Sequence, residues 1–254
     1  MSDRPPVTAA VVIIGNEILS GRTRDTNVAY LAVELDAIGV RLREVRVVPD
    51  VEADIVRAVN ECRARYDHVF TTGGIGPTHD DITAASVAKA FDVPLVRHPQ
   101  AAARLQAHYG AEQLNEARLR MANAPAGAAL IDNPVSVAPG FRIGNVHVLA
   151  GVPSIMQAMF AGLKHGLAGG PPMLSRTIGA FLAEGAIAAG LSALQDRYAR
   201  LEIGSYPFFR QGKFGTSLVL RGTESAAVEA AAAELRALIR GLGGEPLEDD
   251  GAQA

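Results

Sequence analysis

The stretch TAAVVIIG, at residues 8–15, constrains the fold more than any other feature of the sequence. It is a short, continuous run of apolar, mostly β-branched residues, without the alternation that a strand with one wet face shows. Such a run is typical of a strand buried on both faces, as in a parallel sheet covered by helices. The run therefore predicts the central strand of an α/β sheet.

The next segments continue this pattern. Helical spacing predicts a helix over 27–38, and an alternating run predicts a strand over 41–48. We expect a helix capped by Asp50, a strand over 67–72 and a helix from Thr78 to Phe91. This order predicts an α/β domain with a mostly parallel sheet.

The pattern changes after residue 98. Residues 99–121 are helical in character and 123–141 are rich in turns. The stretch 141–151 predicts a hairpin that turns at Gly144 and Asn145, and 153–164 predicts a closing helix.

The glycine- and proline-rich stretch HGLAGGPPML, at 165–174, predicts a linker. We therefore expect a first domain over 1–168 and a small α+β domain of order βαββα over 172–243. The acidic stretch 244–254 has little apolar content and predicts a disordered tail.

Composition excludes several classes of protein. The chain is 48% hydrophobic and 20% charged, with a net charge of −3, so bulk charge does not indicate a nucleic-acid or membrane partner. Cys62 is the only cysteine, so the chain cannot form an internal disulfide. With no membrane-spanning run or signal-peptide core, these features predict a cytoplasmic protein.

The stretch TTGGIGPTHDD, at 71–81, is the main candidate site. Gly73, Gly74 and Gly76 permit positive φ, so their backbone N–H groups can surround a phosphate. Asp80 and Asp81 would repel that phosphate unless a cation lies between them, and Mg²⁺ is commonly held by one or two carboxylates plus phosphates. Asp81 has an alternative role, because it follows the expected helix cap Thr78 at capping-box spacing.

A second loop, GNEILSGRTRDTN at 15–27, also follows a predicted strand. If its strand neighbours the strand over 67–72, both loops lie at one sheet edge, and Glu17 and Asp25 converge with the two aspartates. Asp25 or Thr26 would also cap the following helix.

NPVSVAPG (133–140) and AGVPS (150–154) are further candidates. We expect Ser136 and Gly140 to border the same site, unless they are ordinary turn residues. Ser154, at a predicted helix start, would offer another N–H group to an anion.

Six separated motifs, GNEILSG, DTN, TTGGIGPTHDD, LNEARLRMANAP, NP…APG and GVPS, resemble the molybdenum-cofactor-biosynthesis (molybdopterin-binding) domain, in its CinA-type version. The resemblance covers roughly residues 7–166. The small domain is similar to the KH-like domain of that family, and the deamidase domain that ends many members is not matched.

The resemblance implies a three-layer α/β/α fold that binds a pterin or a nucleotide through phosphate and a divalent cation (Mg²⁺, Mn²⁺ or Co²⁺). The expected catalytic residues are Asp80, Asp81 and Asp25, and the expected metal ligands are Asp80, Asp81 and Glu17. The residues expected to bind substrate or phosphate are Gly15, Asn16, Glu17, Asn27, Thr72, Gly73, Gly74, Gly76, Pro77, Thr78, Ser136, Gly140, Gly151, Pro153 and Ser154.

The function expected from these features is a metal-dependent nucleotide pyrophosphatase with ADP-ribose- or FAD-like substrates, in a homodimer or homotrimer. The alternatives are molybdopterin binding or adenylylation, and a non-catalytic binding or regulatory module. Ile155 stands where CinA-type members often have an acidic residue, which favours the last alternative. GKFG, at 212–215, predicts a hairpin turn, and 172–246 carries eight Lys/Arg against seven Asp/Glu, so the small domain is not expected to bind RNA.

Overall fold

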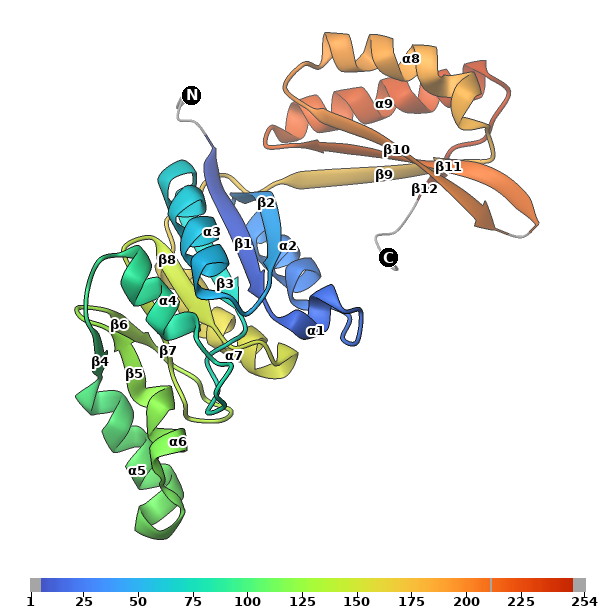
Figure 1. The fold of residues 1–254 in the computed structure, drawn as a ribbon. Helices are drawn as coiled ribbons and strands as arrows, with labels where there is room; N and C mark the ends of the chain where they lie inside the picture. The colour runs from blue at the N-terminus through green and yellow to red at the C-terminus, as the bar shows by residue number, and fades with distance from the viewer. Residues whose placement is uncertain (1–5, 211, 249–254) are drawn as a thin grey trace. The chain divides into compact units, whose positions relative to one another are not determined.

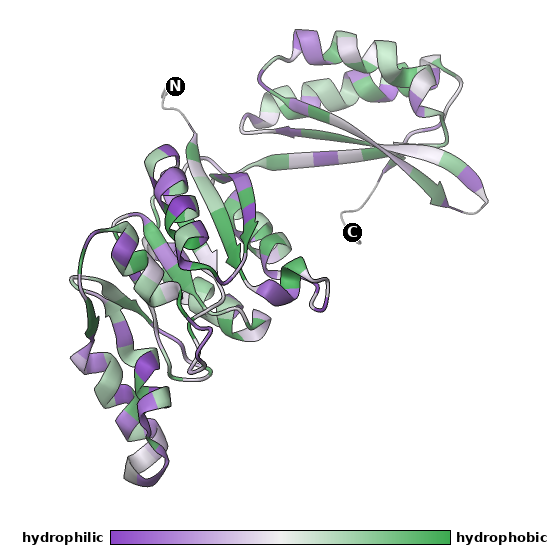
Figure 2. Ribbon diagram, viewed as in Figure 1, coloured by the Kyte–Doolittle hydropathy of each residue, from purple (hydrophilic) through white to green (hydrophobic). Residues whose placement is uncertain are grey.

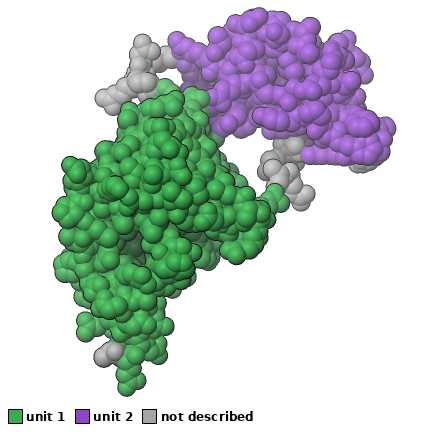
Figure 3. All heavy atoms as spheres, in the orientation of Figure 1, with its two compact units in different colours: residues 1–170 green, residues 171–254 purple. Residues whose placement is uncertain are grey.

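A computed structural model of the chain describes residues 6–210 and 212–248. The chain forms two compact units, residues 1–170 and 171–254 (Figure 3). The boundary falls inside the glycine- and proline-rich stretch 165–174.

The first unit is built on a six-stranded sheet of order β2-β1-β3-β8-β7-β6 (Figure 1). Strands β2, β1, β3 and β8 are parallel, whereas β7 runs antiparallel to β8 and β6 antiparallel to β7. The prediction of a mostly parallel sheet is therefore confirmed. The strands are β1 (Val7–Ile14), β2 (Val40–Val48), β3 (His68–Thr72), β6 (Ala129–Ile131), β7 (Gly140–Ile143) and β8 (Val146–Leu149).

Helices cover both faces of this sheet. Helices α3 (Glu52–Arg65) and α4 (Thr83–Ala90) pack on one face, and α2 (Asn27–Ala37) and α7 (Pro153–Leu163) pack on the other. Strand β1 is hydrophobic along its length (Figure 2) and supplies alternate residues to the two cores. Val12 faces α3, while Val11 faces α2. The continuous apolar run is thus explained, as predicted, by burial of β1 on both faces. The three-layer α/β/α fold is also confirmed.

The remaining elements of the first unit are short, apart from α5. A two-stranded antiparallel sheet joins β4 (Leu95–Arg97) to β5 (Asn123–Pro125), so the turn-rich stretch also contains strands. Helix α5 (Pro99–Gln113) packs its buried Leu105 into a small cluster of its own. The other short elements are α1 (Asn16–Leu19), α6 (Glu116–Leu119), η1 (Arg120–Ala122) and η2 (Lys164–Gly166).

Two predicted helix starts are wrong. The residue that caps α3 is Val51, because the carboxylate of Asp50 instead accepts a hydrogen bond from the backbone N–H of Asn16, at 2.8 Å. Helix α4 begins at Thr83 and not at Thr78, since residues 78–82 form a turn whose polar groups bond to one another.

The second unit has the predicted βαββα order, with one strand more. Its sheet has the order β10-β11-β9-β12, and α8 (Glu184–Arg197) and α9 (Ser225–Gly241) pack their apolar residues against it. The antiparallel pairing of β10 with β11 confirms a hairpin, but the turn lies earlier than predicted, because Lys213, Phe214 and Gly215 already pair with Arg210, Phe209 and Phe208. The strands are β9 (Leu174–Ala180), β10 (Glu202–Arg210), β11 (Lys213–Gly222) and β12 (Leu247–Glu248).

Strand β12 corrects the prediction of a disordered tail from residue 244. Leu247 and Glu248 pair with β9, and Arg236 of α9 makes a two-point ion pair with Glu248. The rest of that tail, 249–254, lies outside the described residues. Among the described helices, none has the length and apolar character needed to cross a membrane.

Helix α2 offers a test of this packing within one turn. Leu31→Ala removes a side chain that is fully buried under the sheet, and should lower the free energy of unfolding of the first unit by about 2–5 kcal/mol. Val33→Ala, at a position that is 68% exposed, should change it by less than about 0.5 kcal/mol. Urea unfolding monitored by circular dichroism measures both, and equal effects would contradict the assigned faces of α2.

Candidate functional site

Loops from the parallel strands meet at one edge of the sheet. Because β1, β2, β3 and β8 are parallel, the loops that follow them lie at the same edge. Backbone hydrogen bonds tie them together: the N–H of Gly15 donates to Val48 O at 3.2 Å, and the N–H of Gly73 donates to Leu149 O at 3.3 Å. The predicted meeting of the loops after β1 and β3 is therefore present.

The first two glycines of the loop are required by close contacts with neighbouring atoms. Gly73 has φ of +100°, and a Cβ there would lie 2.2 Å from the carbonyl oxygen of Ile14. Gly74 has φ of +66°, and a Cβ there would lie 2.2 Å from the hydroxyl of Thr83. That hydroxyl donates to the carbonyl of Gly73 at 2.9 Å, which fixes the loop against the start of α4.

The loop presents unused donors. Within the described chain, the backbone N–H groups of Gly74, Ile75 and Gly76 donate to no protein acceptor. Successive N–H groups of this kind, in a loop with positive-φ glycines, form a concave site for an anion. The geometry therefore fits the predicted phosphate-binding role of this loop.

Asn27 joins the loops on the α2 side. Its Nδ2 donates to the carbonyl of Gly151 at 2.8 Å, and a Cβ on Gly151 would lie 3.2 Å from the Cα of Gly73. The Oδ1 of Asn27 and the hydroxyl of Thr72 are buried without a protein partner. Buried polar groups are nearly always hydrogen-bonded, so these two atoms are available for hydrogen bonds with a ligand or water.

The two aspartates have different partners. The Asp81 carboxylate accepts hydrogen bonds from the N–H of Thr78, at 2.8 Å, and from its hydroxyl, so the predicted link to Thr78 exists in a turn ahead of the helix. Asp80 is exposed, and the neighbouring Thr78 hydroxyl is the main cause that lowers the pKa of its carboxyl. Asp80 is thus an ionised, accessible carboxylate beside the loop.

Of the two acidic residues of the first loop, only Asp25 accepts a hydrogen bond from a nearby backbone group. The Asp25 carboxylate accepts a hydrogen bond from the N–H of Val28 at 3.0 Å, so Asp25, and not Thr26, supplies the side-chain bond at the start of α2. The Glu17 carboxylate folds back over Gly15, where a Cβ would lie 2.6 Å from its oxygens.

The acidic residues do not assemble into a metal-binding cluster. Over 6–210 and 212–248, no group of three or more His, Cys, Asp or Glu side chains is placed to hold a metal. Glu17, Asp25, Asp80 and Asp81 therefore do not form such a group.

A cavity of about 220 Å³ lies beside the glycine loop. Its wall opposite Gly76 and Asp81 comes from the segment before and within β5, and includes Arg120 and Met121. Arg120 also donates from Nη2 to the carbonyl of Pro77 at 3.0 Å, which holds the loop. The motif LNEARLRMANAP contains Arg120 and Met121, although none of its residues was predicted to belong to the site.

The loop 133–140 contributes less than predicted. Asn133 satisfies its own turn: its Nδ2 donates to Ser136 Oγ at 2.7 Å and to Ala138 O at 2.8 Å. Gly140 is buried in β7, where a Cβ would lie 2.2 Å from Val148 O, so its role here is close packing. Pro139 is the residue of this loop that lines the cavity.

The start of α7 has the predicted position. Pro153 opens the helix, and Ser154 is exposed in its first turn. Ile155 packs against the core formed by the sheet, α2 and α7.

Comparison with known proteins identifies the family. Residues 10–168 match the family described as "probable molybdopterin binding domain", and residues 172–242 match "FAD synthase, middle domain". Because the first match covers more than half of the chain, the chain belongs to the molybdopterin-binding-domain family.

Individual relatives support this assignment. The crystal structure of CinA from Thermoplasma acidophilum, described as of unknown function, has 36% identity and a TM-score of 0.60, and covers 63% of this chain and 98% of its own. A probable FAD synthase of Caenorhabditis elegans is 34% identical over 92% of this chain and 50% of its own length. A protein of Pyrobaculum calidifontis is 42% identical over 65% of this chain and 66% of its own length. The chain thus spans about half to two thirds of these curated relatives.

Gly73 and Gly21 form a matched pair for testing the loop. Both have positive φ, but a Cβ on Gly21 would meet nothing within 4 Å. Gly21→Ala should cost only the backbone strain, about 1–2 kcal/mol, whereas Gly73→Ala adds a collision with a backbone carbonyl and should cost about 1–3 kcal/mol more. Thermal unfolding compares the two, and equal losses would show that the contact with Ile14 does not constrain the loop.

Proposed function

We propose that the chain is a divalent-metal-dependent nucleotide pyrophosphatase whose substrates resemble FAD or ADP-ribose. The observation that carries this proposal is the row of unused N–H groups of Gly74, Ile75 and Gly76 in the same loop as the exposed Asp80. Binding of a phosphate near a carboxylate is unfavourable on its own, because the two negative charges repel. It becomes favourable when a cation binds both the phosphate and the carboxylate.

Carboxylate oxygens suit a hard cation that is held partly by the protein and partly by the phosphates of the substrate. Mg²⁺ is usually bound through one or two carboxylates plus substrate phosphates, so Asp80, with help from Asp81, would hold Mg²⁺, Mn²⁺ or Co²⁺ without a third protein carboxylate. The bound cation would neutralise charge on the phosphoanhydride and lower the pKa of a bound water.

The chain's own residues would position the substrate. The N–H groups of the glycine loop would bind the phosphates. Asn27 Oδ1 would accept a hydrogen bond from the substrate, and the Thr72 hydroxyl would donate or accept one, because the protein leaves both atoms without a partner. Glu17 is the acidic residue we propose as a general base, because the Asp25 carboxylate already accepts from the N–H of Val28.

The relatives guide the choice of substrate. The similarity to a probable FAD synthase extends over both units of this chain, and the second unit matches the middle domain of FAD synthase. A flavin or adenosine dinucleotide, whose two halves are joined by a pyrophosphate, is therefore the first substrate class to try.

Molybdopterin binding or adenylylation is a second candidate. The family description supports it, and so does the apolar part of the cavity beside the loop, where Leu95, Met121 and Phe141 suit a planar ring. Pterin fluorescence that co-purifies with the protein and is displaced by added nucleotide would favour this candidate over the first.

Asp80→Asn tests the hydrolase proposal. The native protein should hydrolyse FAD or ADP-ribose only with Mg²⁺, Mn²⁺ or Co²⁺, and Asp80→Asn should lower kcat/KM at least ~10²-fold, because it removes the carboxylate that balances the cation. Asp196→Asn, which makes the same change at an exposed position of the second unit, should keep native activity. Chromatography of the mononucleotide products measures the rate.

Two outcomes would remove the proposal. One is the absence of turnover of FAD, ADP-ribose and NAD with all three metals. The other is unchanged turnover in Asp80→Asn. If the protein bound these nucleotides without hydrolysing them, and Asp80→Asn and Asp81→Asn left that binding unchanged, the chain would be a non-catalytic binding module.

A further inference from the structure

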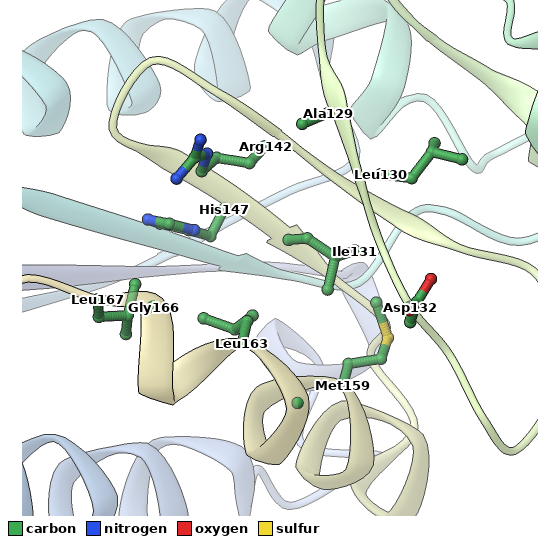
Figure 4. A pocket seen from close by; sticks show the side chains of 11 residues that line it. Ala129, Leu130, Ile131, Asp132, Arg142, His147, Met159, Leu163, Gly166 and Leu167 are labelled. Carbon is green, nitrogen blue, oxygen red and sulfur yellow. The ribbon is translucent and has the colours of Figure 1, made fainter.

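A second cavity lies apart from the glycine loop. It is open to solvent on one side, has a volume of about 320 Å³ and is lined by residues of β6, β7, β8, α7 and the segment after α7 (Figure 4). It shares no lining residue with the cavity beside the loop. Its polar residue on β8, His147, lies near the amino end of that strand, whereas the glycine loop meets the carboxyl end.

His147 is a buried polar side chain in this cavity wall. It is 3% exposed and its ring stacks on Phe70, with centroids 4.9 Å apart. It makes no hydrogen bond to any residue in the described part of the chain. Burial, with smaller effects from His68 and Arg142, lowers its pKa to about 3, so the ring is neutral at pH 7 and carries one N–H donor.

Arg142 is the direct cross-strand neighbour of His147. Figure 4 shows the two side chains next to one another on adjacent strands. Arg142 forms no ion pair with the acidic residues of the described chain, whereas the carboxylate in the wall, Asp132, is paired with Arg104 at 2.6 Å. The wall of the cavity therefore includes one exposed guanidinium that forms no ion pair within the described chain.

The facing wall is apolar. Leu163 and Leu167 lie opposite the two polar side chains, and Ile131 and Met159 close the wall between them. Gly162 is an exposed residue of this wall, and a Cβ there would meet nothing within 4 Å. The cavity thus has a cationic side and a hydrophobic side.

We propose that this cavity binds a small monocarboxylic acid with an apolar body. The guanidinium of Arg142 pairs with the carboxylate, since its fork matches two carboxylate oxygens. The neutral ring of His147 donates its N–H to the same group, which supplies the hydrogen bond it lacks. The apolar body packs on Leu163 and Leu167.

Size and charge set the class of ligand. The volume is at the small end of the ~300–1,000 Å³ range of ligand pockets, which suits a single ring and not a nucleotide. The guanidinium of Arg142 matches one negative charge, and a phosphate dianion would carry excess charge next to Asp132. The proposal does not rest on the proposed pyrophosphatase activity.

Benzoate is the probe for this site, in calorimetry without metal or nucleotide. The native protein should bind it, and Arg142→Gln should weaken binding about tenfold or more, because a charge-assisted pair is lost. Arg43→Gln, the same change at an exposed position of β2 at the far edge of the sheet, should bind benzoate as the native protein does. Gly162→Leu should fill the cavity and abolish binding while the helix is retained, since leucine favours the helix over glycine.

Related probes test the class of ligand. Benzyl alcohol, without the charge, and phenyl phosphate, with a second charge, should both bind at least tenfold more weakly than benzoate. No heat of binding with benzoate, equal affinity in Arg142→Gln, or retained binding in a folded Gly162→Leu protein would each overturn the site. Equal or tighter binding of phenyl phosphate would overturn its assignment to a monocarboxylate.

Discussion

The close approach of Gly73 to the carbonyl of Ile14 is the contact on which the rest of the site depends. No side chain fits between the end of β1 and the turn after β3, because a Cβ would come within 2.2 Å of that oxygen. With its first residue fixed, the loop takes positive φ at two successive glycines and passes to α4 through the bonds of Thr83. The following N–H groups are then left without protein acceptors, which creates the anion site.

The acidic residues near this edge of the sheet are of two kinds. Asp25, Asp50 and Asp81 accept hydrogen bonds from backbone N–H groups and hold the loops in place. Asp80 lies exposed, with the pKa of its carboxyl lowered by a hydroxyl neighbour. Most of the carboxylates near the anion site therefore serve structural hydrogen bonds. Because Asp80 is exposed, it is the carboxylate that we propose as the main ligand of a cation.

The sequence predicted those features that depend on local pattern. The two-sided burial of 8–15, the positive φ of Gly73 and Gly74, and the hairpin at Gly144 follow from residue type and period, so they were found. Contacts between distant segments were missed. Asp50 has the spacing of a helix cap but bonds to Asn16, and Arg120 reaches Pro77 across 43 residues. Strand β12 has only two residues and forms by pairing with β9, so its sequence alone does not predict a strand.

Calorimetric titration of inorganic pyrophosphate, with and without Mg²⁺, tests the central claim most directly. A phosphate–cation–carboxylate site predicts that Mg²⁺ strengthens pyrophosphate binding by at least about tenfold in the native protein. Asp80→Asn should remove most of that enhancement while binding without metal is retained or improved, because a negative charge beside the cradle is lost. Pyrophosphate binding that is equally tight with and without Mg²⁺, or a magnesium effect that persists in Asp80→Asn, would contradict the account.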